Sequence, residues 1–339
     1  MSTPQPPYPL DPSVEHLLEP QYVEFYNKYI INQQVVHHQP VEASRSSGVL
    51  IPGASDALEV AKIEDYTLTR TETKGESFKV RVFTPTSPKP EAGYPIFLYF
   101  HGGGWVLGNI NTENVHCTNW AQRAECVCVS VDYRLAPEHP YPAAVEDAWE
   151  SYLWLANGGA SLIGGDLTKL AAGGSSAGGN LTAILTHMIT ERQSSTPSLP
   201  SICFQLLVVP VTDNTADGDI YWTYDKFQNT AALPREKMLW YRYKYLPDEK
   251  TWSEPRASPL YYPERSFKSC PPAYVAVAEL DVLRAEGEFY AAKLQRSGVP
   301  VKVKVYKGVP HVVMAMDGVL DRGKELVSDC CEELYKAFH

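Results

Sequence analysis

The run GGSSAGGN at residues 173–180 combines a possible nucleophile with residues that permit a tight turn. It follows an apolar stretch at 170–172 and precedes a helical pattern. Where a strand turns sharply into a helix, a serine is held strained and exposed, and small flanking residues let neighbouring backbone approach. The pattern alone is weak because Gly, Ser and Ala are common. It nevertheless makes Ser176 the candidate nucleophile.

A second segment could stabilise the charge that such a nucleophile creates. The sequence HGGGW at residues 101–105 directly follows the strand-like run 96–100. Glycine-rich turns in this position present backbone N–H groups to a developing oxyanion. The bulky Trp105 beside this turn is a candidate wall of the substrate pocket, and Ser175 is a second candidate pocket residue.

An acid and a base follow downstream, each just after a strand-like run. Asp281 comes after residues 274–277, and His311 comes after residues 301–306. Loops at the ends of strands are where an α/β sheet collects its catalytic groups. Glu279 and Glu286 are neighbouring acids that could take this role, and Glu279 is our second choice. The chain order serine, acid, histidine is that of the α/β-hydrolases.

Together these motifs are far more specific than any one of them. The chain resembles the hormone-sensitive-lipase-like family of α/β-hydrolases, which includes microbial carboxylesterases and arylacetamide-deacetylase-like enzymes. The resemblance spans most of the chain beyond about residue 80 and rests on HGGGW (101–105), VDYRLAPEHPYPAAVEDA (131–148), GSSAGGN (174–180), ASPL (257–260), DVLRAEG (281–287) and the His311 loop.

The chain departs from the family pattern at two positions. Many members carry Asp or Thr where this chain has Ser175, and many have an acidic residue where it has Ala285. Neither position is the nucleophile, acid or base. The departures therefore concern hydrogen bonding around the turn and the acid loop.

The elements that must position these residues follow from the hydrophobic pattern. Strand-like runs alternate with helical segments after the first pair, which predicts an α/β-hydrolase fold: a mostly parallel eight-stranded sheet flanked by helices. A crossover helix is expected over residues 142–156, ended by the glycine pair 158–159. The predicted strands are 63–70, 78–84, 96–100, 126–131, 169–173, 204–209, 273–277 and 301–306.

Two segments do not fit the alternation, at about 11–39 and 213–254. In the family these regions pack together as a helical cap over the active site. The resemblance therefore implies four parts: 1–50 and 213–256 as the cap, and 51–212 and 257–339 as the α/β-hydrolase core. The second cap segment is crowded with aromatic residues, most of which we assign to a thin cap core: Tyr221, Trp222, Tyr224, Phe227, Trp240, Tyr241, Tyr243, Tyr245 and Trp252.

The expected mechanism is that of a serine hydrolase. His311 takes the proton of Ser176 as its oxygen attacks an ester carbonyl, while Asp281 orients the imidazole. The oxyanion is held by the N–H groups of three residues: Gly103, Gly104 and Ala177. We expect structural roles for the other histidines considered, namely His101, which braces the oxyanion loop, His116, His139 and His187.

We expect a carboxylesterase for short- to medium-chain acyl esters, because an alcohol leaves more readily than an amine. Amidase, deacetylase or lactonase activity on the same scaffold is the alternative. A non-catalytic small-molecule receptor is a further alternative, as in the plant gibberellin receptors that resemble this family. Those receptors lack the catalytic histidine, whereas this chain has His311.

The amino-acid composition limits the classes of molecule that the protein is expected to bind. The 339 residues carry a formal charge of −10 without a dense Lys/Arg cluster, which argues against nucleic-acid binding. No secretory signal or membrane-span pattern is present, and seven cysteines without scaffold spacing suit a reducing compartment. We expect a cytoplasmic monomer or homodimer that acts on a small ester, without stable membrane insertion, and that uses no metal or organic cofactor.

Overall fold

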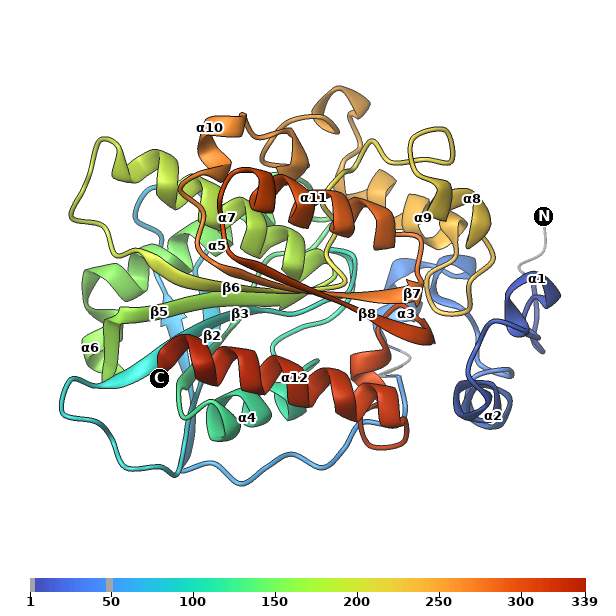
Figure 1. Cartoon of the computed structure of the whole chain (residues 1–339), viewed down its shortest axis with the longest axis horizontal. Helices are drawn as coiled ribbons and strands as arrows, with labels where there is room; N and C mark the ends of the chain where they lie inside the picture. Colours follow the sequence, from blue (N-terminus) through green and yellow to red (C-terminus); the bar gives the residue numbers. More distant parts are fainter. Residues whose placement is uncertain (1–3, 47–50) are drawn as a thin grey trace.

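A single eight-stranded sheet forms the centre of the computed structural model, which describes residues 4–46 and 51–339 (Figure 1). Long apolar runs supply its inner strands, and every residue of the third strand is buried. The strands are β1 (Lys62–Leu68), β2 (Phe78–Thr84), β3 (Tyr94–Phe100), β4 (Val127–Asp132), β5 (Gly165–Ser175), β6 (Ile202–Val208), β7 (Ala273–Leu280) and β8 (Val301–Pro310).

The strand order is β1-β2-β4-β3-β5-β6-β7-β8. The β1–β2 and β2–β4 pairs are antiparallel, and all other neighbouring pairs are parallel. The prediction of a mostly parallel eight-stranded sheet is therefore confirmed. Because parallel strands all end at the same edge, the loops that follow β3, β5, β7 and β8 meet there.

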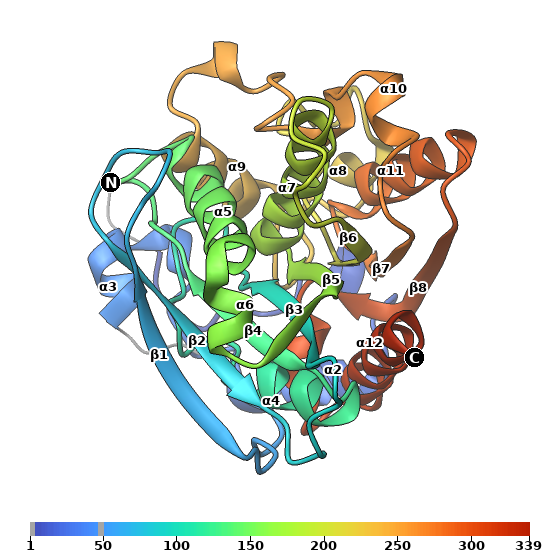
Figure 2. The same cartoon turned by 90° about the vertical axis from the view of Figure 1, so that its left-hand side faces the viewer.

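Helices cover both faces of the sheet, as expected for a parallel sheet (Figures 1 and 2). One face carries α4 (Asn114–Arg123) and α12 (Asp321–Phe338). The other carries α5 (Ala143–Trp154), α7 (Ala177–Gln193) and α11 (Arg284–Arg296). Shorter elements complete the core: α6 (Ala160–Leu162), α10 (Glu264–Phe267), η4 (Pro259–Tyr261) and η5 (Val313–Met316).

The predicted crossover helix is present as α5, and its helical backbone is interrupted at the predicted glycine pair. The segment η2 (Leu155–Gly159) links α5 to α6, and Asn157 and Gly158 within it have non-helical backbone angles. The chain bends there because Gly158 adopts a positive φ of 116°, which a residue without a Cβ accepts at little cost.

The two segments outside the alternation lie beyond the carboxyl ends of the strands (Figure 1). The first contains α1 (Pro12–Glu15), α2 (Pro20–Tyr29), η1 (Val36–His38) and α3 (Val41–Ser46). The second contains α8 (Trp222–Lys226), α9 (Arg235–Tyr245) and η3 (Glu249–Thr251). We refer to these segments together as the cap; part of the first predicted segment, residues 1–3 and 47–50, lies outside the described residues.

Aromatic side chains make much of the cap interior. Tyr224, Tyr241 and Tyr245 are buried, whereas Trp222 and Tyr243 are about half exposed. A thin helical layer needs such large side chains to form any core. No helix in the described part of the chain has the length and apolar character that crossing a membrane requires.

Candidate active site

Ser176 stands at the turn between β5 and α7 in a strained conformation. Its φ of +53° is uncommon for any residue other than glycine. The turn is fixed by its backbone, since the Ser176 N–H donates to the Val208 carbonyl at 2.8 Å. A Cβ at Gly178 would overlap the Phe100 carbonyl of the adjacent strand, which explains a glycine there. Small residues thus let the turn lie directly against the sheet.

The three side chains proposed from the sequence as nucleophile, base and acid are brought together. Ser176 Oγ lies 2.9 Å from Nε2 of His311, and His311 Nδ1 lies 2.7 Å from Oδ2 of Asp281. All three residues are buried. This chain of contacts allows a proton to pass from the serine hydroxyl to the imidazole, while the carboxylate accepts the other ring N–H.

The acid loop is held by the cap as well as by its own backbone. Asp281 Oδ1 accepts the Leu283 N–H at 3.0 Å. Hydroxyls from the second cap segment bond the carbonyls on either side of Asp281: Thr230 donates to Leu280 and Thr223 to Val282, at 2.5 and 2.7 Å. A displacement of the cap would therefore disturb the acid.

Neither neighbouring glutamate contacts His311. Glu279 accepts hydrogen bonds from Lys307 Nζ at 2.9 Å and from the Gly308 N–H at 2.8 Å. Glu286 is fully buried and accepts the Thr212 N–H at 2.7 Å. Burial, together with the charge of Asp213, raises the pKa of Glu286 well above its ordinary value. Of these three acids, only Asp281 is placed to orient the base.

The loop after β3 adopts backbone conformations that demand glycine. Gly103 and Gly104 have φ values of +118° and +61°. A Cβ at Gly103 would overlap the Leu107 carbonyl, and one at Gly104 would overlap the ring of Tyr241. Within the described residues, neither glycine N–H donates to another protein group. Ala177 is the first residue of α7, where a helix leaves N–H groups free.

His101 supports this loop from behind. Its ring stacks on Tyr133 with centroids 4.3 Å apart, and its Nδ1 lies 2.7 Å from the Gly102 carbonyl. Tyr133 in turn donates its hydroxyl hydrogen to the His101 carbonyl at 2.8 Å. Burial lowers the pKa of His101, so the ring stays neutral. This arrangement gives His101 no contact with the triad.

Sequence reasoning missed Glu113, just before α4, which connects the turn at Ser176 to the glycine loop. Its Oε1 accepts the Ser175 hydroxyl at 2.8 Å and the Gly102 N–H at 3.3 Å. Its Oε2 accepts the Tyr99 hydroxyl at 2.8 Å. Glu113 belongs to none of the recognised motifs, and no local signal distinguishes it from a surface glutamate.

The two candidate pocket residues, Trp105 and Ser175, are both buried. Trp105 stacks on Tyr245 of α9, with ring centroids 4.3 Å apart and an interplanar angle of 8°. It thereby joins the glycine loop to the cap. Ser175 directs its hydroxyl to Glu113, as described above.

The remaining predicted structural histidines lie apart from the triad. His116 Nε2 is 3.0 Å from the Met314 carbonyl. His187 lies between the Ser266 and Tyr290 hydroxyls, and burial lowers its pKa to about 3. His139 is exposed.

Comparison with known proteins shows which family the chain is similar to. Residues 97–315 match a family model described as the alpha/beta hydrolase fold. An AB hydrolase superfamily protein from Schizosaccharomyces pombe is 48% identical over 334 residues, which cover 97% of each chain. An arylesterase from Saccharolobus solfataricus is 31% identical over 335 residues, which cover 97% of this chain and all of that protein.

The chain is also similar in structure to solved esterases. A thermostable esterase from Pseudomonas putida superposes with a TM-score of 0.85 at 30% sequence identity. The match covers 95% of this chain and 98% of the esterase.

Proposed function

The chain belongs to the α/β-hydrolase fold family, in its hormone-sensitive-lipase-like group, and we propose that it is a serine carboxylesterase for short- to medium-chain acyl esters. The observation that carries this proposal is the continuous contact from Ser176 through His311 to Asp281. Relatives that are named for ester hydrolysis support it.

In the proposed first half-reaction, His311 removes the proton of Ser176 as the serine oxygen forms a bond to the ester carbonyl carbon. Asp281 fixes the imidazole tautomer and stabilises the imidazolium. When the tetrahedral intermediate collapses, the bond to the alcohol oxygen breaks and His311 gives its proton to that oxygen. Water then attacks the acyl-enzyme by the same route and releases the carboxylic acid.

The N–H groups of Gly103, Gly104 and Ala177 are proposed to stabilise the oxyanion. The positive-φ turn at the two glycines, supported by His101 and Glu113, is proposed to fix these donors before the reaction begins. Loss of one such donor typically costs about 10²–10³ in kcat. The reaction as proposed needs no metal or organic cofactor.

Trp105 is proposed to wall the acyl or alcohol pocket, because it lies at the junction of the glycine loop and α9. Substrate access then depends on the cap, since Ser176 is only 7% exposed.

We retain the four-part division proposed from the sequence, with the cap at 1–50 and 213–256 and the core at 51–212 and 257–339.

We also propose that the protein acts in the cytoplasm as a monomer or homodimer. All seven cysteines are free, which suits a reducing compartment. The proposed partner is a small ester, because the triad residues are buried and similar proteins are named for ester hydrolysis.

Hydrolysis of a chain-length series of p-nitrophenyl esters tests the proposal, together with a matched series of p-nitroanilides. We expect rapid hydrolysis of the short and medium esters, slower cleavage of the anilides, and loss of both in a folded Ser176→Ala variant. A wild-type protein without esterase activity, or ester hydrolysis that survives the substitution, would overturn it. Faster anilide cleavage would instead identify an amidase.

A further inference from the structure

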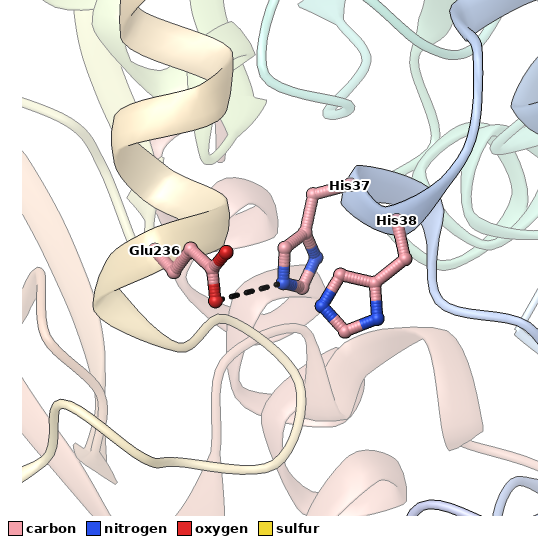
Figure 3. A group of neighbouring side chains, drawn as sticks. All are labelled: His37, His38 and Glu236. Carbon is pink, nitrogen blue, oxygen red and sulfur yellow. Dashed lines mark ion pairs between the residues drawn. The ribbon is translucent and has the colours of Figure 1, made fainter. Parts of the chain in front are cut away.

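Two histidines and a glutamate gather where the two cap segments meet (Figure 3). His37 and His38 come from η1, and Glu236 comes from the first turn of α9. Each of the three residues offers one ligand atom, and these atoms all lie within 4.8 Å of one another. The proposed esterase reaction uses none of them.

We propose that His37, His38 and Glu236 form a zinc site that fastens the N-terminal cap segment to α9. Two imidazole nitrogens and one carboxylate oxygen are a ligand set that zinc takes with a water molecule in the fourth position. Imidazole favours zinc and its transition-metal neighbours, whereas calcium and magnesium prefer oxygen ligands. The inference does not depend on the proposed function.

The spacing of the ligand atoms fits the size of the ion. A tetrahedral zinc ion with bonds of about 2.1 Å holds its ligand atoms about 3.4 Å apart. His37 Nε2 and Glu236 Oε2 are 3.7 Å apart, a separation that is too long for a hydrogen bond. The Glu236 side chain is 77% exposed, so it can close the remaining gap by a small rotation.

Both histidines have ring nitrogens that lack a hydrogen-bond partner in the described part of the chain. The His37 side chain is only 5% exposed, and the rings of His37 and His38 lie 4.3 Å apart. Among the described residues, Nδ1 of each histidine is buried without a hydrogen-bond partner. The nitrogen of His37 that faces Glu236 is the other one, Nε2, and in the described part of the chain it makes no hydrogen bond either. A metal ion bound through that nitrogen would provide a reason to keep two adjacent imidazoles in this position.

Lys237 on α9 places a positive charge near His37. Its Nζ donates a hydrogen bond to the Ala232 carbonyl at 2.9 Å. The carboxylate of Glu236 offsets this charge next to an incoming cation.

Fixing α9 matters because the same helix covers the glycine loop. Tyr241 lies on α9 and packs its ring against Gly104. Zinc bound at Glu236 would therefore stabilise the helix that places this ring.

The test is calorimetric titration of EDTA-treated, dialysed and untagged protein with ZnCl2, with MgCl2 as a second titrant. We expect one zinc ion per chain and no magnesium binding. Glu236→Gln and His38→Ala should each weaken zinc binding by about tenfold or more, since even the partners of metal ligands contribute about 10–100-fold. His139→Ala, at an exposed histidine outside the cap, is the matched control and should bind zinc as the wild type does.

Heat unfolding of the same proteins in EDTA checks their folding, and Glu236 is exposed enough for its isosteric substitution to be tolerated. At the same zinc concentration, the unfolding midpoint should rise more in the wild type and in His139→Ala than in Glu236→Gln. Failure of the wild type to bind zinc would overturn the proposal. Equal zinc binding by Glu236→Gln, His38→Ala and the wild type would also overturn it.

Discussion

The hydroxyl of Ser175 donates a hydrogen bond of 2.8 Å to Glu113. The same carboxylate accepts the Gly102 N–H at 3.3 Å and, through its other oxygen, the Tyr99 hydroxyl. The residue before the proposed nucleophile and the loop that faces the proposed oxyanion are therefore held by one side chain. Ser175, which departs from the family pattern, supplies the donor for this contact.

Glu113→Gln should lower kcat by about tenfold with little change in KM, because an indirect displacement of the glycine loop costs less than loss of an oxyanion donor. The three groups that contact Glu113 all donate hydrogen bonds to its two carboxylate oxygens. The glutamine side chain has only one acceptor oxygen, so it cannot accept all of these bonds in the same arrangement. Steady-state kinetics provide the measurement. Ser175→Ala removes one donor and should have a smaller effect. An unchanged kcat in Glu113→Gln would show that the contact does not position the loop.

Asp281→Asn should lower kcat by about 10³–10⁴ because the amide no longer holds the imidazole in the productive tautomer. Glu279→Gln is the matched control, since Glu279 contacts Lys307 and Gly308 instead of His311. It should retain near-normal esterase activity. If Glu279→Gln were the damaging change and Asp281→Asn the mild one, the acid would be misassigned.

Gly104→Ala should reduce kcat/KM by about 100-fold or more, because a displaced loop misplaces the reacting groups. Gly158→Ala is the control, because it places an alanine at a positive φ without a steric clash and so measures the effect of backbone strain alone. Gly158 also has a positive φ, but a Cβ there would meet no neighbouring atom within 4 Å. It should cost about 1–2 kcal/mol of unfolding free energy and leave the kinetics unchanged. Equal activity of the two variants would refute the proposed contact between Gly104 and Tyr241.

Because of Glu286, the free energy of unfolding should fall as the pH rises. Burial, followed by the charge of Asp213, raises its folded-state pKa well above the ordinary 4.5, so the folded chain keeps a proton that the unfolded chain releases. Stability from this group is complete below about pH 4.5 and declines as the pH rises through the folded-state pKa, by at most about 1.4 kcal/mol per pH unit.

Glu286→Gln keeps a neutral group of the same shape and should remove this decline. Urea unfolding at about pH 5.5 and pH 8 provides the measurement. The variant should gain unfolding free energy relative to the wild type as the pH increases. A difference between the two proteins that stays constant across this range would show that Glu286 does not carry the proton.

Much of the fold was accessible from the sequence because parallel strands buried on both faces are continuous apolar runs. β3 is such a run, and its prediction at 96–100 missed only two residues of the strand that begins at Tyr94. β5 extends well beyond the predicted 169–173, from Gly165 to Ser175. Its ends carry polar and small residues that give no strand pattern, and pairing with β3 and β6 extends the strand into them.

The candidate site was predictable only where its residues lie in local motifs. Ser176, Asp281 and His311 each follow a strand, and a shared sheet edge brings them together. The Glu113 contact spans 62 residues and leaves no pattern in the sequence. The cluster of His37, His38 and Glu236 likewise depends on the packing of η1 against α9, which spacing along the chain cannot reveal.

Covalent labelling with diethyl p-nitrophenyl phosphate tests the central proposal most directly. The serine oxygen should displace p-nitrophenolate, so that mass spectrometry finds one diethylphosphoryl group per chain, located on Ser176. Esterase activity should fall in proportion to this labelling, and Ser176→Ala should take up no label. A label on a different residue, or full activity in protein labelled completely at Ser176, would contradict the proposed mechanism.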